Sequence, residues 1–409
     1  MRTKKFLVHR DVVGALKHIS YDSGKISWVD DLTAPQWVFD RNEGSVDKCL
    51  KILLRVNGLE AEYNPGAVNR KVYSKILPPH VKCIPWSLCL PSTVYKETLK
   101  NFLTSVSLFD VDSAYYDVGY SNFRRLVSKF KPFRVDEKVL RKLFDEASDS
   151  LLVHLDSLLP QADGFVQPPK YNFFGTRTGR LTVASGPMVL TLPKDRRNLF
   201  LAGKKSRIVQ IDFSSLEPRL LAALAKLPAF EGDLYEEISR TCFSGKLTRD
   251  RTKVALLGIL YGMSVDTLST HIELPVDDCR VILSTVKRHF KIKELLTRIE
   301  KETIGDSTRN FFGKIIEINR PSMLNNYVQS SGVDVAHIGF DKLLQDAEFL
   351  GIEFKPMFLV HDALVGEVSD EAFSKLSALV SKGFYCSQLN NVFPLTIEDF
   401  AKPPSIIEP

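Results

Sequence analysis

The sequence predicts an α/β fold with more than one domain, and three observations support this prediction. Apolar residues recur at helical spacing in several long segments after residue 130, whereas short apolar runs typical of strands occur at 208–211 and 357–368. The chain has 409 residues, which is too long for one ordinary core. Hydrophobic residues make up 44% and charged residues 25%, as in a soluble globular protein.

The individual elements follow from local patterns. A short apolar strand at 208–211 runs into Asp212, and residues 357–368 read as a β-hairpin around His361-Asp362. Residues 164–170, with two prolines, read as a loop. Helices are predicted over 135–159, 216–227, 248–263 with Thr248 as N-cap, 276–303, and 332–350 with Gly351 as C-cap.

Targeting signals and cysteine chemistry are both unremarkable in this sequence. No apolar run is long enough to cross a bilayer, and the basic N-terminus lacks the uninterrupted apolar stretch of a secretory signal. The six cysteines are scattered and form no CxxC pair, which favours reduced thiols over zinc sites or disulfides. We therefore expect an intracellular, cytoplasmic protein without a membrane partner.

Positive charge is concentrated in two stretches. The net charge of +6 is modest, but residues 170–207 contain nine basic side chains and one acid. In residues 121–134, aromatic and cationic side chains interleave without an acid. Each stretch alone could be a solvated surface; together they favour a partner with a phosphate backbone.

Two aspartates at the ends of apolar strands are the candidate catalytic residues. Asp212 ends the strand at 208–211, and Asp362 lies in the predicted hairpin 150 positions later. Two divalent metal ions need carboxylates on rigid supports, and a strand end supplies both rigidity and exposure. Each segment also has an ordinary interpretation: Ser214-Ser-Leu-Glu217 matches a helix capping box, and His361-Asp362 matches a turn.

The predicted helix over 248–263 presents a third set of candidates. Arg249, Lys253, Leu257 and Tyr261 recur every four residues, and each such step overshoots a full turn by about 40°, so they share one broad face. Two cations, an apolar side chain and an aromatic ring next to Gly262 would suit a triphosphate, its sugar and its base in that order. The alternative is an amphipathic helix with a cationic first turn, which fits poorly because cations there oppose the helix dipole.

Five segments together resemble the polymerase half of the DNA polymerase I family, family A. Their order and rough spacing match that family from about residue 140 to about residue 400. The matching segments are Thr178-Gly-Arg-Leu-Thr182, Asp212-Phe-Ser-Ser-Leu-Glu-Pro-Arg219, Arg249 to Gly262, Asn325 with Gln329, and Leu359-Val-His-Asp362.

The resemblance implies a role for each metal- and nucleotide-side residue. Asp212 and Asp362 would bind two magnesium ions. Arg249 and Lys253 would hold the incoming triphosphate, and Tyr235 falls where the family has a residue near the phosphates.

The sugar, the base and the primer would meet the remaining residues. Glu217 would lie beneath the sugar and exclude a ribose hydroxyl, Leu257 would face the sugar, and Tyr261 with Gly262 would flank the template base. The residues expected at the primer or template are Arg177, Arg180, Asn325, Gln329 and His361.

Four positions depart from the family pattern. Leu257 stands where the family has Phe or Tyr, and Ala363 replaces the Glu that follows the second aspartate, so metal binding would depend on Asp212 and Asp362. Leu190 and Thr191 replace a Gln-Asn pair.

The implied architecture is a right-hand polymerase fold with an antiparallel palm sheet. Its expected parts are an N-terminal region of unknown role at 1–95, a thumb and its connection at 96–207, palm segments at 208–235 and 304–409, and fingers at 236–303. The implied activity is template-directed addition of deoxynucleotides to a primer, with primer-template DNA and dNTPs as partners. Two alternatives stay open: a single-subunit RNA polymerase, which Glu217 disfavours, and a catalytically silent DNA-binding factor.

We expect no 3′→5′ proofreading. Only 175 residues precede Thr176 and they include the thumb, whereas an exonuclease domain needs on the order of 150–200 residues of its own. The one short acidic cluster upstream is Asp110-Val-Asp112 with Tyr116 and Asp117, which an ordinary turn explains. Residues 1–95 would then be an exonuclease remnant or a DNA- or partner-binding module, and a form this compact resembles an enzyme carried by a phage.

Overall fold

The computed structural model describes most of the chain after residue 120. The described residues are 5–8, 17–22, 25–30, 38–39, 91–94, 96–97, 119, 121–146, 149–172, 176, 178–230 and 232–401. Arg177 and the acidic cluster at 110–117 lie outside these ranges, so the expectations for them stay predictions.

A four-stranded antiparallel sheet forms the centre of the molecule. It consists of β9 (Ser206–Phe213), β12 (Phe354–Val360), β13 (Ala363–Ser369) and β16 (Leu395–Asp399), in the order β12-β13-β9-β16. Every neighbouring pair is antiparallel, which confirms the predicted antiparallel sheet. The predicted strand at 208–211 is the middle strand β9, and the predicted hairpin at 357–368 is the edge strand β12 with the middle strand β13.

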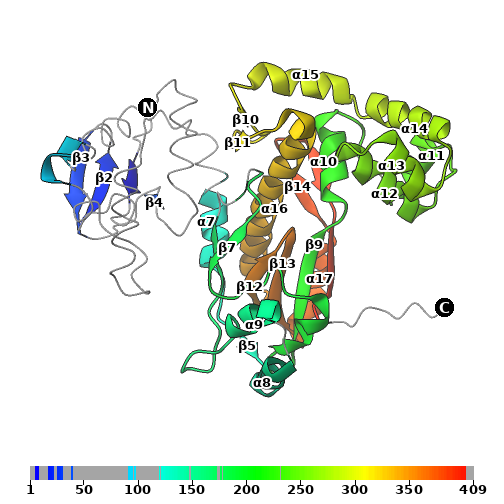
Figure 1. Ribbon diagram of the computed structural model, residues 1–409. Coiled ribbons are helices and arrows are strands. Elements are labelled where there is room, and N and C mark those ends of the chain that lie inside the picture. Colours follow the sequence, from blue (N-terminus) through cyan, green and yellow to red (C-terminus); the bar gives the residue numbers. More distant parts are fainter. Residues whose placement is uncertain are drawn as a thin grey trace.

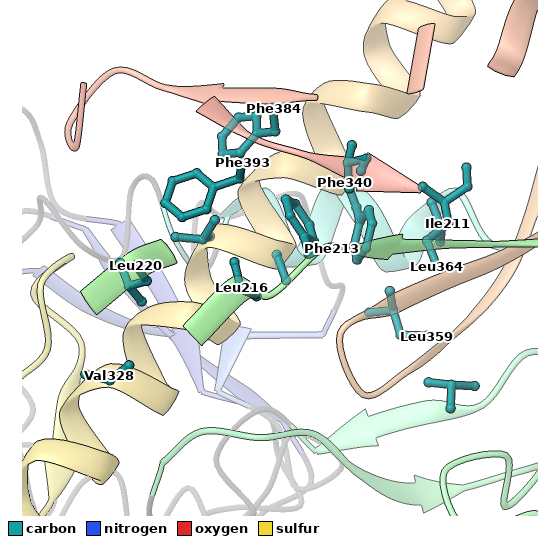
Figure 2. Packing of buried hydrophobic residues seen from close by; sticks show 14 of the residues in the cluster. Ile211, Phe213, Leu216, Leu220, Val328, Phe340, Leu359, Leu364, Phe384 and Phe393 are labelled. Atoms are coloured by element: carbon teal, nitrogen blue, oxygen red, sulfur yellow. The ribbon is translucent and has the colours of Figure 1, made fainter. Parts of the chain in front are cut away.

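The long helix α16 (Met323–Phe349) lies against the central sheet (Figure 1), and apolar residues on one face of the sheet pack against it. The Phe213 ring of β9 lies 5.1 Å from Phe340 of α16 and 6.4 Å from Phe384 (Figure 2). Alternation along β9 turns Ile211 and Phe213 into this core, so Gln210 and Asp212 point to the opposite face. The helices α10 (Leu216–Leu224), α17 (Asp370–Val380) and α7 (Ser121–Ser128) complete the layer around α16.

A group of five helices follows α10. Figure 1 shows them gathered at the upper right, with each helix contacting the next. They are α11 (Leu234–Cys242), α12 (Arg249–Leu260), α13 (Val265–Ile272), α14 (Val276–His289) and α15 (Ile292–Glu302).

Short elements connect these parts. The paired strands are β5 (Arg134–Val135) with β8 (Phe200–Leu201), β6 (Lys170–Asn172) with β7 (Thr182–Ser185), β10 (Ser307–Arg309) with β11 (Ile315–Glu317), and β14 (Phe384–Cys386) with β15 (Asn391–Phe393). The remaining helices are α8 (Glu137–Glu146), α9 (Asp149–Asp156) and the 3₁₀ turns η3 (Lys194–Leu199) and η4 (Arg320–Ser322).

The N-terminal region contributes a separate small sheet. Its strands are β1 (Lys5–Val8), β2 (His18–Asp22), β3 (Lys25–Val29) and β4 (Val38–Phe39), in the order β3-β2-β1-β4. β1 pairs with β2 antiparallel and with β4 parallel.

Three predicted helices differ from the observed ones. The segment 135–159 forms two helices, α8 and α9. The segment 276–303 also forms two, α14 and α15, because Lys291 between them adopts a left-handed φ of 48°. The helix predicted to begin at 332 begins at Met323. Its predicted end is confirmed: at Gly351 (φ 63°) the chain leaves the helix, and the Ile352 N–H donates to the Ala347 carbonyl at 2.9 Å.

None of the helices in the described part of the chain is long and apolar enough to cross a bilayer. Cys242, Cys279 and Cys386 are buried free thiols, and burial raises the pKa of Cys242 to about 11.

Candidate active site

Asp212 lies on the open face of the central sheet, held from both sides by the hydrogen-bond ladder. Its cross-strand neighbours are Ala363 on β13 and Thr396 on β16. The Oδ1 atom of Asp212 is buried and has no hydrogen-bond partner among the described residues. A buried carboxylate oxygen without a donor is costly, so this position suits a bound cation.

The charges around Asp212 lead to the same conclusion. Burial, and then the nearby charge of Asp362, raise the pKa of Asp212 to about 7, against the opposing effect of a hydrogen bond from the Phe213 N–H. Glu398 raises this pKa further, and Lys194 lowers it. The carboxylates therefore lack sufficient positive charge, which is the condition under which a divalent cation stabilises such a pair.

Asp362 is presented by a tight turn. His361 and Asp362 form the two-residue connection between β12 and β13, and His361 takes a left-handed φ of 56°. Both side chains are exposed. Ala363 follows on β13 directly opposite Asp212, so a carboxylate at residue 363 would stand beside Asp212, but the alanine supplies none.

No cluster of three or more His, Cys, Asp or Glu side chains that could hold a metal occurs within the ranges that the structure describes. Mg²⁺ is commonly held by one or two carboxylates together with substrate phosphates, so a two-carboxylate site fits this ion.

A pocket next to Asp362 brings five of the predicted residues together. Its polar lining consists of these five, Arg180, Glu217, Gln329, His361 and Asp362, together with His337, and apolar side chains including Leu181, Leu190 and Leu216 complete it. These residues come from four segments far apart in the sequence. The position at which Leu replaces a polar family residue, Leu190, thus borders this pocket.

Arg180 and Gln329 form a hydrogen-bonded unit in the pocket wall. With its amide oriented to satisfy both neighbours, Gln329 donates to Thr178 Oγ at 2.6 Å and accepts from Arg180 Nη2 at 2.9 Å and Nε at 3.2 Å. Arg180 Nη2 also lies 3.2 Å from Glu217 Oε1. Asn325 lies one turn before Gln329 on α16 and is half-buried.

Glu217 joins the sheet side of the site to α12. The Tyr261 hydroxyl donates to Glu217 Oε2 at 2.6 Å, and burial together with this hydrogen bond raises the pKa of Tyr261 to about 12. The capping-box interpretation is therefore wrong. The N-cap of α10 is Ser215, in a left-handed conformation and without a side-chain cap, and the Glu217 carboxylate bonds to distant partners instead.

The face of α12 carries its predicted residues in different environments. Arg249 is tied by its Nε to Asp233 Oδ2 at 2.7 Å, Lys253 is exposed, and Leu257 is half-buried. Gly262 has a φ of 77° just after the helix, where the Met263 N–H donates to the Gly258 carbonyl at 2.8 Å. Gly262 is thus needed for the helix end as well as for any contact with a base.

Tyr235, which was expected near the phosphates, is buried in the core, and burial raises the pKa of its hydroxyl. The Arg249 guanidinium lies 5.5 Å from its ring centroid, so any contact of Tyr235 with phosphates would act through Arg249.

The basic stretch at 121–134 is used partly inside the protein. Arg125 Nη2 lies 2.7 Å from the buried Asp341 of α16, and Lys129 lies 3.1 Å from Glu348. In the other stretch, Arg197 hydrogen-bonds Gln210 and stacks 4.5 Å from the centre of the Phe400 ring. Arg125 and Lys129 thus pair with α16 and Arg197 supports the sheet, so these cations are not simply a surface for phosphates.

Sequence reasoning missed Asp233 and gave no role to Arg219. Asp233-Leu-Tyr-Glu236 is an N-cap pattern, so a helix start was visible there, but the pairing with Arg249 depends on the tertiary structure.

Comparisons with known proteins find similar sequences and a similar fold. The fold resembles that of the POL domain of Pol1 from M. smegmatis in complex with DNA primer-template and dNTP, with a TM-score of 0.56 and 14% identity over 98% of this chain and 96% of that chain. DNA polymerase I of Aquifex aeolicus is 26% identical over 240 residues, which are 52% of this chain and 41% of that protein. The thermostable DNA polymerase I of Thermus aquaticus is 26% identical over 255 residues, which are 53% of this chain and 30% of that protein.

These two relatives are much longer than the segment they share with this chain, since the aligned part spans less than half of each. The family profile of DNA polymerase family A matches residues 138–398, more than half of the chain. That range contains both aspartates, the pocket and α12. The chain belongs to DNA polymerase family A.

Proposed function

We propose that this chain is a DNA-directed DNA polymerase that adds deoxynucleotides to the 3′-hydroxyl of a primer. The observation that carries the proposal is the proximity of Asp212 on β9 to Asp362 in the turn before the neighbouring strand β13, within the region that matches the family. The structural relative in complex with primer-template and dNTP supports the same substrates for this chain.

The metal ions proposed for the site are two Mg²⁺ held by Asp212 and Asp362. The unpartnered Oδ1 of Asp212 and its raised pKa support this assignment. When bound, such ions would lower the pKa of the attacking hydroxyl and offset the charge on the departing pyrophosphate. In the reaction a bond forms between the primer 3′-oxygen and the α-phosphorus, and the bond from that phosphorus to the pyrophosphate oxygen breaks.

The protein side chains would bind and orient the nucleotide. Arg249 and Lys253, on one face of α12, would take the triphosphate, and Leu257 on the same face would lie toward the sugar. Glu217 would lie beneath C2′, where its hydrogen bond from Tyr261 fixes the carboxylate and leaves no room for a ribose hydroxyl. Tyr261 and Gly262 would adjoin the template base.

The pocket beside Asp362 would receive the primer terminus. Arg180, Gln329 and His361 line that pocket, and Asn325 lies on the same helix one turn away. Arginine and amide side chains are suited to phosphate oxygens and to the minor-groove edges of bases. We assign the same role to Arg177.

The domain division proposed from the sequence follows from these roles. Residues 208–235 and 304–409 would form the palm, 236–303 the fingers, and 96–207 the thumb with its connection. The role of 1–95 stays open between an exonuclease remnant and a binding module.

Primer extension with Mg²⁺ tests the proposal. The wild type should extend a primer with deoxynucleotides, and Asp212→Asn and Asp362→Asn should each lower the rate at least about 10³-fold, because each removes a metal ligand. Primer-template affinity should change less than about threefold. Loss of DNA binding with retained turnover would contradict the assignment, and binding without extension by the wild type would favour the silent DNA-binding factor. Efficient use of ribonucleotides would favour the RNA polymerase.

The same wild-type protein tests the proposed absence of proofreading. A 5′-labelled primer with a 3′ mismatch, incubated with metal and no nucleotides, should keep its length. Progressive shortening that disappears in Asp110→Ala would overturn this part of the proposal.

A further inference from the structure

The carboxylate of Asp233 makes two separate connections. Its Oδ1 accepts hydrogen bonds from the backbone N–H groups of Tyr235 at 2.8 Å and Glu236 at 3.1 Å, which caps α11. Its Oδ2 accepts a hydrogen bond from Arg249 Nε at 2.7 Å. One side chain thus ties the start of α11 to the start of α12.

The segment that carries Asp233 is itself anchored to α10. The buried Arg219 donates from Nη1 to the Phe230 carbonyl at 3.4 Å and from Nη2 to the Gly232 carbonyl at 3.0 Å. Arg219 lies two residues after Glu217, in the segment that begins with Asp212. A continuous set of contacts therefore runs from the catalytic strand through Arg219 and Asp233 to Arg249.

This set of contacts restricts the Arg249 side chain. Its Nε is occupied by Asp233, and its guanidinium lies 5.5 Å from the Tyr235 ring centroid. Among the contacts of the described residues, the terminal nitrogens reach only the exposed Asp250, at 3.5 Å from Nη1. Within the described part of the chain, Nη1 is thus engaged only by this long contact with an exposed side chain, and both terminal nitrogens can turn to phosphate oxygens while the plane of the guanidinium is held.

We propose that Asp233 is a positioning residue that holds Arg249 in the orientation that receives the triphosphate of the incoming nucleotide. The inference rests on the proposed function and goes beyond it by assigning specificity for the triphosphate to a residue that does not touch the nucleotide. Ordering one long side chain in advance changes affinity by roughly 2- to 10-fold.

The electrostatics of the pair agree with this role. Burial alone would raise the pKa of Asp233, but the hydrogen bonds from Arg249 and the two backbone N–H groups outweigh burial and lower it. The hydrogen bond to Asp233 in turn raises the pKa of Arg249. Both groups are therefore ionised at neutral pH, and the bond between them is charge-assisted.

An asparagine at residue 233 separates the two connections. Asparagine is as good an N-cap as aspartate, so Asp233→Asn should keep α11 capped while it removes the charge that holds Arg249. The matched control lies on the same helix: Arg251 of α12 pairs with Glu273 at 2.5 Å, and neither residue belongs to the proposed site. Glu273→Gln removes that ion pair and should leave nucleotide use unchanged.

The test measures kcat and KM for a dNTP in primer extension by the full chain, together with the affinity for inorganic tripolyphosphate. Asp233→Asn should raise KM about three- to tenfold with kcat and Tm close to wild type, because an interaction shared by ground and transition states is lost. Tripolyphosphate affinity should fall by a similar factor. In an Arg249→Ala background, Asp233→Asn should have no further effect.

Several outcomes would overturn the inference. They are an unchanged KM in Asp233→Asn, a lowered KM (which would make Asp233 a competitor of phosphate), or an equal rise in Glu273→Gln. Failure of the proposed function is distinguishable, because it would appear as no extension by the wild type. In that case tripolyphosphate affinity decides: weaker binding in both Asp233→Asn and Arg249→Ala supports the positioning role, and wild-type affinity in Asp233→Asn overturns it.

Discussion

The two sides of the candidate active site are built in different ways. On the sheet side, formed by the central sheet with α10 and α16, Asp212 is fixed by backbone ladders on both edges and by an aromatic core behind it. On the helical side, formed by α11 to α15, the two candidate cations Arg249 and Lys253 are exposed, and Arg249 is held by its ion pair with Asp233. An exposed ion pair contributes only about 0–1 kcal/mol. The comparison indicates that the proposed metal site is placed rigidly, whereas the proposed nucleotide-binding face is adjustable through individual side chains.

The largest effect on the helical side is expected from Lys253→Ala. Lys253 is exposed on the same face of α12 as Arg249, so its loss would remove a cation from the triphosphate without disturbing the core. We expect kcat/KM for a dNTP to fall about 10²-fold, since charge-assisted contacts to phosphate are among the stronger polar interactions. Lys246→Ala, an exposed lysine before α12, is the control and should differ less than about twofold. Equal losses in the two variants would mean that net charge, and not this face, matters.

Next in size is the contact that joins the two sides, Glu217 with Tyr261. Glu217→Ala should raise ribonucleotide use relative to deoxyribonucleotide use by at least about tenfold, because the carboxylate beneath C2′ is removed. Tyr261→Phe keeps that carboxylate but removes the hydrogen bond that fixes it, so a smaller rise of about two- to fivefold is expected. The measurement is competitive incorporation opposite one template base. Unchanged ratios in both variants would contradict a role for Glu217 at the sugar.

Local sequence patterns were sufficient for the strands of the central sheet that lead to the two aspartates. The apolar run into Asp212 and the hairpin at His361-Asp362 are specified by residues next to each other, and the helix end at Gly351 depends on one left-handed glycine. The resemblance then placed Arg180, Glu217 and Gln329, which the structure brings into one pocket.

Features that depend on residues far apart in the sequence were not predicted. The first turns of α16 contain buried polar residues, which obscure the apolar pattern that would predict a helix. Two of them are satisfied by distant partners: Ser330 Oγ accepts from the Asn310 side chain and Ser331 Oγ from the Phe311 N–H, beside β10. Glu217 matches a capping box locally, but its carboxylate accepts a hydrogen bond from the hydroxyl of Tyr261, 44 residues away. Tertiary contacts override propensity at such positions.

Substitution of two helical glycines, one on the sheet side and one on the helical side, tests how tightly each side is packed. A Cβ at Gly339 of α16 would lie 2.7 Å from Phe213 Cζ and 3.0 Å from Phe384 Cδ1, both in buried rings. Gly339→Ala should therefore destabilise the protein by about 1–2 kcal/mol despite the better helix propensity of alanine. A Cβ at Gly258 of α12 would meet the flexible end of Met263 at 2.7 Å, which can move aside. Gly258→Ala should thus stay within about 0.5 kcal/mol of wild type in chemical denaturation. The opposite order would contradict the contrast between a rigid and an adjustable side.

The smallest expected effect is that of the Asp212 carboxylate on the stability of the metal-free protein. The pKa of Asp212 is raised to about 7, so the native state disfavours the ionised carboxylate, and stability falls as pH rises from the usual aspartate value through 7. At pH 8 in EDTA, Asp212→Asn should therefore melt a few °C higher than wild type, because the amide carries no charge to bury. At pH 4 the difference should vanish, since the wild-type carboxyl is then largely protonated in the native state.

Added Mg²⁺ should raise the Tm of the wild type and leave that of Asp212→Asn nearly unchanged. Asp145→Asn, an exposed position on α8, controls for the loss of one negative charge and should behave as wild type. A lower Tm for Asp212→Asn in EDTA at pH 8 would show that the carboxylate already has a partner within the protein, and the case for a cation at Asp212 would lose its main support.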